Sequence, residues 1–171
     1  SRSSGRPRRA ISAPTAEAVH IDIVAVGRFK RGPEAALYER YVARCPWRID
    51  LHEVVLKKAV AATQVRAAES RLLAEHLDGP RPVVVLDERG HLPASADIAA
   101  TLGRWRDDAR GGARFVIGGA DGVDDELRGR ADAVWAFGRL TWPHLMVRAL
   151  LAEQLYRAAS LLAGHPYHRG D

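Results

Sequence analysis

PVVVLD, residues 82–87, decides the fold class: an uninterrupted apolar run of this length is typical of a strand buried on both faces. A second buried-strand run, ARFVIGG, occupies residues 113–119. The intervening segment 95–109, SADIAATLGRWRDDA, has helical spacing and offers Ser95 as an N-cap. A strand, a helix and another strand in this order indicate a parallel sheet with a helical crossover.

The same alternation extends outward in both directions along the chain. The patterns predict three more strands, at residues 20–27, 47–55 and 133–138. They predict further helices at residues 33–45, 61–79 and 124–131, and from about 143 to 163. The expected fold is therefore α/β, with a largely parallel sheet flanked by helices on both faces. Residues 20–171 are expected to form one domain.

The charge of the chain is unevenly distributed. The 171 residues carry a net charge of +5, of which residues 1–19 contribute +3 through four arginines and one glutamate. We interpret this segment as a disordered or artificially added basic extension. The remaining body carries only +2, so we expect it to bind naked RNA weakly and to need a structured RNA context, since phosphate affinity comes largely from Lys and Arg.

Several site types are disfavoured by composition. The single cysteine, Cys45, excludes an intrachain disulfide framework or a multi-cysteine metal centre and favours a reduced, cytoplasmic setting. His165 and His168 lack a nearby carboxylate or thiolate, so we predict no metal. No apolar run reaches the ~18 residues that a membrane span needs, and no membrane contact is expected.

Glycine-containing loops follow three of the predicted strands. They are ERGHL at 88–92, GGADGV at 118–123 and GRLTWPH at 138–144. Because ligands bind beyond the carboxyl ends of parallel strands, these loops predict a small-molecule pocket. Gly118, Gly119 and Gly122 permit positive φ and a close approach of backbone to a ligand.

The loop sequences favour a nucleoside that carries no phosphate. GGADGV matches neither the dinucleotide pattern nor the phosphate loop, and no lysine follows it. Asp121, Asp124 and Asp125 would repel phosphates. Leu86 and Leu140 are the expected apolar walls of the pocket.

The chain ends in AGHPYHRGD, residues 163–171, an unusual concentration of reactive side chains. Gly164 can end the last helix in a left-handed cap, and Pro166 prevents its continuation. Tyr167, His168 and Arg169 would then be displayed on a short stiff segment over the pocket loops of the same chain or of a dimer partner. Alternatively, Tyr167 simply packs and the other two are solvated.

Three segments resemble the RlmH family of bacterial SPOUT-class methyltransferases: residues 24–41, 115–123 and 140–169. The resemblance covers residues 20–171 and implies a SPOUT-type α/β fold with a trefoil knot near the C-terminus. It also implies a homodimer that uses S-adenosyl-L-methionine to methylate N3 of a pseudouridine in 23S rRNA on the assembled ribosome. His91 and Leu145 depart from the family pattern, which usually has lysine and proline there.

The resemblance further implies which residues form the site. The cofactor-binding residues carried over from the family are Leu86, Gly119, Gly138, Arg139, Leu140, Thr141, Trp142 and Pro143. For catalysis, His168 or His144 is expected to accept the N3 proton, Arg169 or Arg148 to hold a carbonyl oxygen or phosphate, and Tyr167 to contact the base. A non-catalytic ribosome- or RNA-binding factor is the alternative, and a nucleotide hydrolase is disfavoured by the missing phosphate loop.

Overall fold

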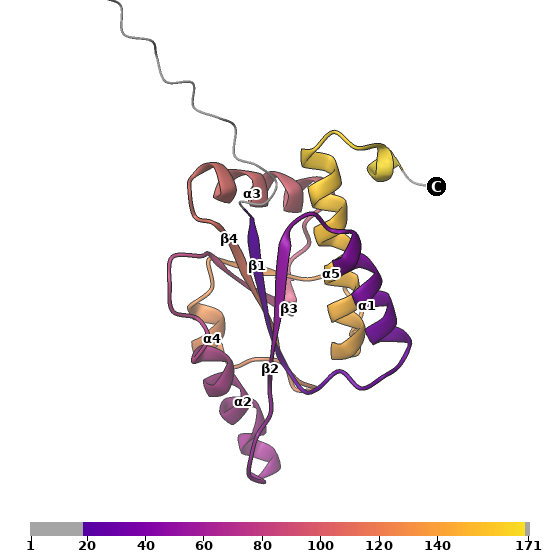
Figure 1. Ribbon diagram of the computed structural model, residues 1–171. Helices are drawn as coiled ribbons and strands as arrows, with labels where there is room; N and C mark the ends of the chain where they lie inside the picture. The colour runs from indigo at the N-terminus through magenta and orange to yellow at the C-terminus, as the bar shows by residue number, and fades with distance from the viewer. Residues whose placement is uncertain (1–18, 170–171) are drawn as a thin grey trace, which may run out of the picture.

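A computed structural model describes residues 19–169 of the chain, with side chains described up to Tyr167 (Figure 1). The predicted extension lies outside this range except for Val19, which is buried and accepts a hydrogen bond from the Arg48 amide. The elements are β1 (His20–Val26), α1 (Pro33–Arg44), β2 (Arg48–Val54), η2 (Ala62–Gln64), α2 (Val65–Ala74), β3 (Val83–His91), α3 (Ser95–Asp107), β4 (Gly112–Ile117), α4 (Asp125–Gly129), β5 (Ala133–Trp135), α5 (His144–Leu162) and η3 (Pro166–Arg169).

The five strands form one parallel sheet in the order β2-β1-β4-β3-β5. Helices α1, α3 and α5 cover one face, and α2 and α4 cover the other, as Figure 1 shows. Because every pairing is parallel, all the carboxyl ends of the strands meet at one edge of the sheet, called here the carboxyl edge. This confirms the predicted α/β architecture, whereas the trefoil knot stays a prediction.

Alternate strand residues build two apolar cores. Ile21, Ile23 and Phe115 pack against α1, α3 and α5, whereas Val24 and Val116 pack on the opposite face. On α5, the stripe that includes Leu151, Leu155 and Ala158 is fully buried in the first of these cores. The apolar spacing that predicted α5 therefore reflects burial against the sheet and its neighbouring helices.

The start of α3 differs from the prediction. Ser95 is the first helical residue rather than the N-cap, and Ala94 occupies the cap position. The Ala94 amide donates to the Asp97 carboxylate at 2.9 Å, and this hydrogen bond caps the start of the helix. The Ser95 hydroxyl is thus available to donate to Gln154 on α5 at 2.7 Å.

Three other elements have limits that differ from the prediction, one of them the strand expected over 133–138, which ends at Trp135. The helix expected over 61–79 begins as the 3-10 turn η2, and α2 ends at Ala74, because the chain then turns to bury Leu77. Strand β3 continues to His91, whose carbonyl accepts from the Ala136 amide at 2.8 Å. A β-carbon at Gly90 would lie 2.7 Å from the Trp135 backbone, so this continuation needs a glycine at position 90.

The end of α5 matches its predicted chemistry. Gly164 has φ +71°, which confirms the left-handed cap, and the His165 amide donates back to the Ser160 carbonyl. The chain then forms η3, a single 3-10 turn that the sequence did not predict. Among residues 19–169, no helix combines the length and apolarity required to cross a membrane.

Candidate functional site

A cavity of about 390 Å³ opens at the carboxyl edge, beyond β3, β4 and β5 and beside the start of α5. It is lined by residues 86–89, 117–122, 135–138 and 140–142, with His144 and Val147. The structure thereby brings together Leu86, Gly119, Gly138, Leu140, Thr141 and Trp142 of the predicted cofactor residues. Arg139 and Pro143 lie next to lining residues in the chain but do not line the cavity themselves.

The glycine loop 118–122 is folded tightly on itself. The Gly122 amide donates to the Gly119 carbonyl at 3.0 Å, and a β-carbon at Gly118 would lie 2.7 Å from the Gly122 backbone. Among the three glycines of this loop, only Gly122 has a positive φ, of +71°. The other two are therefore required by close packing rather than by backbone conformation.

Gly119 is constrained by α2 and β1. A β-carbon there would lie 2.5 Å from Glu69 Oε2 and 3.2 Å from Val26 Cγ1. Neither Glu69 nor Val26 lines the cavity, so a larger residue at this position would push the loop off its support. A side chain at position 119 would therefore clash with residues of this chain, whether or not a ligand is bound.

Glu69 is an unusual acid. Its Oε2 is buried and has no hydrogen-bond partner among the described residues. Burial and then the negative charge of Asp121 raise the pKa of Glu69 above its ordinary value. Together with Asp121 it places negative potential beside the glycine loop.

Asp87, at the bend within β3, is neutralised locally. Its Oδ1 accepts from the Arg89 amide at 2.9 Å, and its Oδ2 accepts from Arg128 Nη2 at 3.1 Å. Burial opposes ionisation of Asp87, but these hydrogen bonds and the two arginine charges outweigh it and lower the pKa. At the rim, Thr141 donates to Glu88 at 3.0 Å, which ties the loop after β5 to β3.

His144 lies at the junction of the cavity and the loop after β1. It lines the cavity, and a β-carbon at Gly27 would lie 3.6 Å from its Nε2. Burial, followed by the charge of Arg148, lowers the pKa of His144 below its ordinary value. His144 is therefore a neutral imidazole at pH 7, able to accept a proton.

Arg148 does not line the cavity. It is fully buried, donates to the carbonyls of Val26 and Gly27 at 2.7 Å each, and pairs with Glu53 at 3.0 Å. Its guanidinium also stacks 4.6 Å from the centre of the Phe29 ring. Its predicted contact with a substrate stays a prediction, and its observed contacts hold the ends of β1 and β2 together.

Tyr167 packs against the side of α5. Its ring lies 4.5 Å from the Tyr156 ring, and its hydroxyl donates to Glu153 at 3.3 Å. Glu153 lies nine helical positions after His144, about 14 Å at 1.5 Å per residue, and Tyr167 does not line the cavity of its own chain. The side chains of His168 and Arg169 lie outside the described part of the structure.

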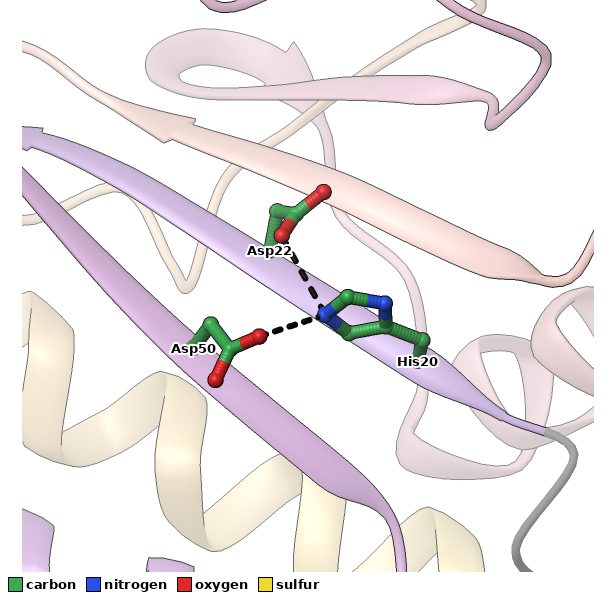
Figure 2. A group of neighbouring side chains, drawn as sticks. All are labelled: His20, Asp22 and Asp50. Carbon is green, nitrogen blue, oxygen red and sulfur yellow. Dashed lines mark hydrogen bonds and ion pairs between the residues drawn. The ribbon is translucent and has the colours of Figure 1, made fainter.

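A second polar cluster lies near the amino ends of β1 and β2 (Figure 2). His20 Nε2 is 2.7 Å from Asp50 Oδ2 and 3.4 Å from Asp22 Oδ1. These three residues form the one group within residues 19–167 whose ligand atoms are close enough to hold a metal ion. However, Asp22 already pairs with Arg81 and Arg114, which balance its charge without an ion. The prediction that the protein binds no metal stays a prediction.

Sequence reasoning did not find Glu69, Asp87 or Arg128. Asp87 could have been recognised, because it directly follows the buried run VVVL at a strand end. Glu69 gives no such signal, since it occupies an ordinary helical position and reaches the glycine loop only through the packing of α2 on the sheet.

Known proteins match both the sequence and the fold. Residues 19–168 match the model of the predicted SPOUT methyltransferase family. The chain is 48% identical over 147 residues to the "Ribosomal RNA large subunit methyltransferase H" of Rhodospirillum centenum, covering 86% of this chain and 97% of that protein. It is 50% identical, with the same coverage, to the protein of that name from Paramagnetospirillum magneticum.

A solved structure supports the architecture. The crystal structure of a probable methyltransferase from Bordetella pertussis Tohama I aligns with a TM-score of 0.52 at 12% identity, covering 83% of this chain and 97% of that one. At this identity the likeness concerns the fold alone. Together with the family match and the close relatives, the fold and the glycine-lined cavity at its carboxyl edge show that this chain belongs to the SPOUT methyltransferases, in the family of the ribosomal RNA large subunit methyltransferases H.

Proposed function

We propose that the protein methylates N3 of a pseudouridine in 23S rRNA, using S-adenosyl-L-methionine, as a homodimer acting on the assembled ribosome. The observation that carries the proposal is the cavity, which belongs to a methyltransferase fold and has the size of a small-ligand site, about 390 Å³. Relatives about half identical to this chain carry the name of an rRNA methyltransferase.

The cavity suits a cationic nucleoside. Leu86, Ile117 and Leu140 supply apolar surface, and the glycine loop exposes backbone polar groups. Glu88 and Asp121 add negative charge that favours a sulfonium cation and disfavours phosphates. The residues that would hold S-adenosyl-L-methionine are therefore those at the ends of β3, β4 and β5.

The chain must also remove a proton from the base. When bound, S-adenosyl-L-methionine supplies a methyl group activated by the positive sulfur. Attack by N3 requires loss of the N3 proton, and neutral His144 at the cavity wall is the described residue best placed to accept it. His168 is the other candidate base, with Tyr167 and Arg169 contacting the base or its phosphate.

The homodimer is supported by two features of the monomer. Tyr167 of the C-terminal segment packs against Glu153 and Tyr156 on α5 and does not line the cavity of its own chain, so the segment would complete the site of a second copy. Two exposed apolar side chains line the cavity, Leu140 at 68% exposure and Trp142, and a third, Met146, lies next in the chain to the lining residue Val147. Exposed apolar surface beside a functional site is typical of protein interfaces.

The test measures cofactor and product separately. Calorimetry should show saturable binding of S-adenosyl-L-methionine, and mass spectrometry should detect a new N3-methylpseudouridine after incubation with ribosomes that lack it. Protein-free 23S rRNA is the matched substrate and should react much more slowly, because the body carries a charge of only +2. Ribosome binding without cofactor binding would instead favour the non-catalytic factor.

A further inference from the structure

Five cations lie on the two loops that continue β1 and β2 at the carboxyl edge, and a sixth lies at the start of α2. We call these residues the basic loop surface: Arg28, Lys30, Arg31, Lys57, Lys58 and Arg66. Segments 27–32 and 55–66 contain no acid. All six side chains are exposed, and none forms an ion pair with another described residue.

The sheet holds these two loops next to each other. Val26 and Val54 are register partners at the ends of β1 and β2, and the Gly27 amide donates to the Val54 carbonyl at 2.9 Å. Both loops leave the same end of the sheet (Figure 1). The bases of the two loops are therefore adjacent, although 38 positions separate Arg28 from Arg66 in the chain, and the cations flank this point where the loops depart toward α1 and α2 (Figure 1).

Buried Arg148 fixes the base of this surface. It holds the Gly27 carbonyl on one side and the Glu53 carboxylate on the other, and it stacks on Phe29 between Arg28 and Lys30. The roots of the two loops are thus rigid, whereas the charged ends are free to contact a partner. Such an arrangement lowers the cost of ordering the surface on binding.

The charge at the carboxyl edge changes sign along the sheet. The β1–β2 side carries the six cations, whereas the cavity on the β3–β5 side is lined by Glu88 and Asp121, together with Asp87 and Arg89, which pair with each other. With strands about 4.8 Å apart, the centres of the two regions are about 12 Å apart, roughly three to four nucleotides at a duplex rise of about 3.4 Å.

We propose that the basic loop surface binds the RNA backbone next to the nucleotide that enters the cavity. Unpaired lysines and arginines on loops match a row of phosphates. Glu88 and Asp121 at the cavity repel phosphates. This inference rests on the proposed function, because it assumes that the cavity receives an RNA base. It assigns the phosphate contacts to the opposite half of the edge from the cofactor loops, and so reconciles a near-neutral body with an RNA substrate.

The test compares two double charge reversals. Lys57→Glu/Lys58→Glu changes the basic loop surface, and Arg71→Glu/Arg130→Glu makes the same charge change on exposed residues of α2 and the segment after α4. Affinity for ribosomes and for protein-free 23S rRNA is measured without cofactor, across a series of salt concentrations. Methyl transfer and calorimetric binding of S-adenosyl-L-methionine are measured in parallel.

We expect the Lys57/Lys58 variant to lose tenfold or more in affinity for both RNA substrates and in kcat/KM. Its salt dependence should become shallower by about 1.5 in the slope of log affinity against log salt. kcat at saturation and cofactor affinity should change less than threefold, and the Arg71/Arg130 variant should stay near wild type.

Three outcomes would overturn the inference. Equal losses in the two variants would indicate general charge repulsion. An unchanged affinity of the Lys57/Lys58 variant would place the phosphate contacts elsewhere. A loss on ribosomes with unchanged affinity for protein-free 23S rRNA would assign the surface to an acidic ribosomal protein. If the wild-type protein binds RNA but no S-adenosyl-L-methionine, the proposed function is contradicted instead. The RNA affinities of the two double variants, measured without cofactor, still test the basic loop surface.

Discussion

The guanidinium of Arg148, on the last helix, donates to the carbonyl oxygen of Gly27, at the end of the first strand, across 2.7 Å. The same group reaches Val26 and Glu53, so one fully buried cation joins α5 to both β1 and β2. This contact couples the start of α5, which forms part of the cavity wall, to the loops that carry the basic surface.

Replacing this cation should destabilise the fold. Arg148→Met leaves two backbone carbonyls and the Glu53 carboxylate without their donor, which should lower the free energy of unfolding by about 2–4 kcal/mol. Urea denaturation measures the change. Arg40→Met, at an exposed position of α1, is the control and should stay within about 0.5 kcal/mol of wild type. A similarly small effect at Arg148 would contradict its role as a buried link.

The Gly119 contact predicts a specific rescue. In Gly119→Ala the added β-carbon meets the Glu69 carboxylate, so the loop should shift and affinity for S-adenosyl-L-methionine should fall about tenfold, equivalent to about 1.4 kcal/mol. Glu69→Ala in the same chain removes that obstacle and should restore part of the affinity by calorimetry. If the double variant binds no better than Gly119→Ala, the clash lies with another group.

The rate of methyl transfer should depend on pH through His144. Its pKa is lowered in the folded protein, so the imidazole is neutral and active at pH 7 and loses activity only as the pH falls below its ordinary value of about 6.5. His144→Ala should lower the single-turnover rate by about 10²–10⁴-fold and remove this acid limb. If the methyl-transfer rate of His144→Ala keeps the wild-type dependence on pH, another residue is the base.

The Asp22 cluster makes stability depend on pH. Burial opposes ionisation of Asp22, but its hydrogen bond from His52 and the charges of Arg81, His20 and Arg114 outweigh it and lower the pKa. A lowered carboxyl pKa contributes stability above the unfolded value, about 3.9, and the contribution is lost as pH falls through the folded value.

Asp22→Asn should therefore cost about 2–4 kcal/mol at pH 7, and the difference from wild type should shrink as the pH falls below about 4. Thermal unfolding across this range measures it. Asp107→Asn removes an exposed carboxylate and is the matched control. A constant difference at every pH would mean that Asp22 acts through packing alone.

The position of Tyr167 predicts complementation between two inactive variants. Truncation after Ala163 removes the C-terminal segment, and Gly119→Val damages the cofactor loop. If the segment acts across the dimer, randomly mixed chains should regain roughly a quarter of wild-type methyl transfer, because half the dimers hold one intact composite site. No recovery, despite dimer exchange shown by mass spectrometry, would mean that each chain completes its own site.

Local sequence patterns predicted most elements but not their limits. The apolar runs of β1, β3 and β4 are unambiguous because both faces of these strands are buried. The extension of β3 to His91 was missed, since Glu88 and Arg89 favour a loop and the pairing partners of His91, at Trp135 and Ala136, are distant in sequence. The early end of α2 was missed for the same reason, because residues 75–79 tolerate a helix and burial of Leu77 prevents it.

The candidate site residues likewise divide into those that a local sequence pattern predicts and those that depend on packing. Residues at strand ends, such as Leu86 and the glycine loop, could be found from sequence because a parallel sheet gathers its carboxyl ends at one edge. Glu69 and the burial of Arg148 depend on how α2 and α5 pack, which no local pattern encodes. The adjacency of the two basic loops likewise depends on the pairing of β1 with β2.

The opposite charges of the two halves of the carboxyl edge give the protein an electric dipole in the plane of the sheet. Near a polyanion this dipole experiences a torque, which rotates the molecule until its β1–β2 side leads. If the basic loop surface binds RNA, its orientation would be set during diffusion, and added salt should slow the arrival of the protein at RNA more than it speeds its departure.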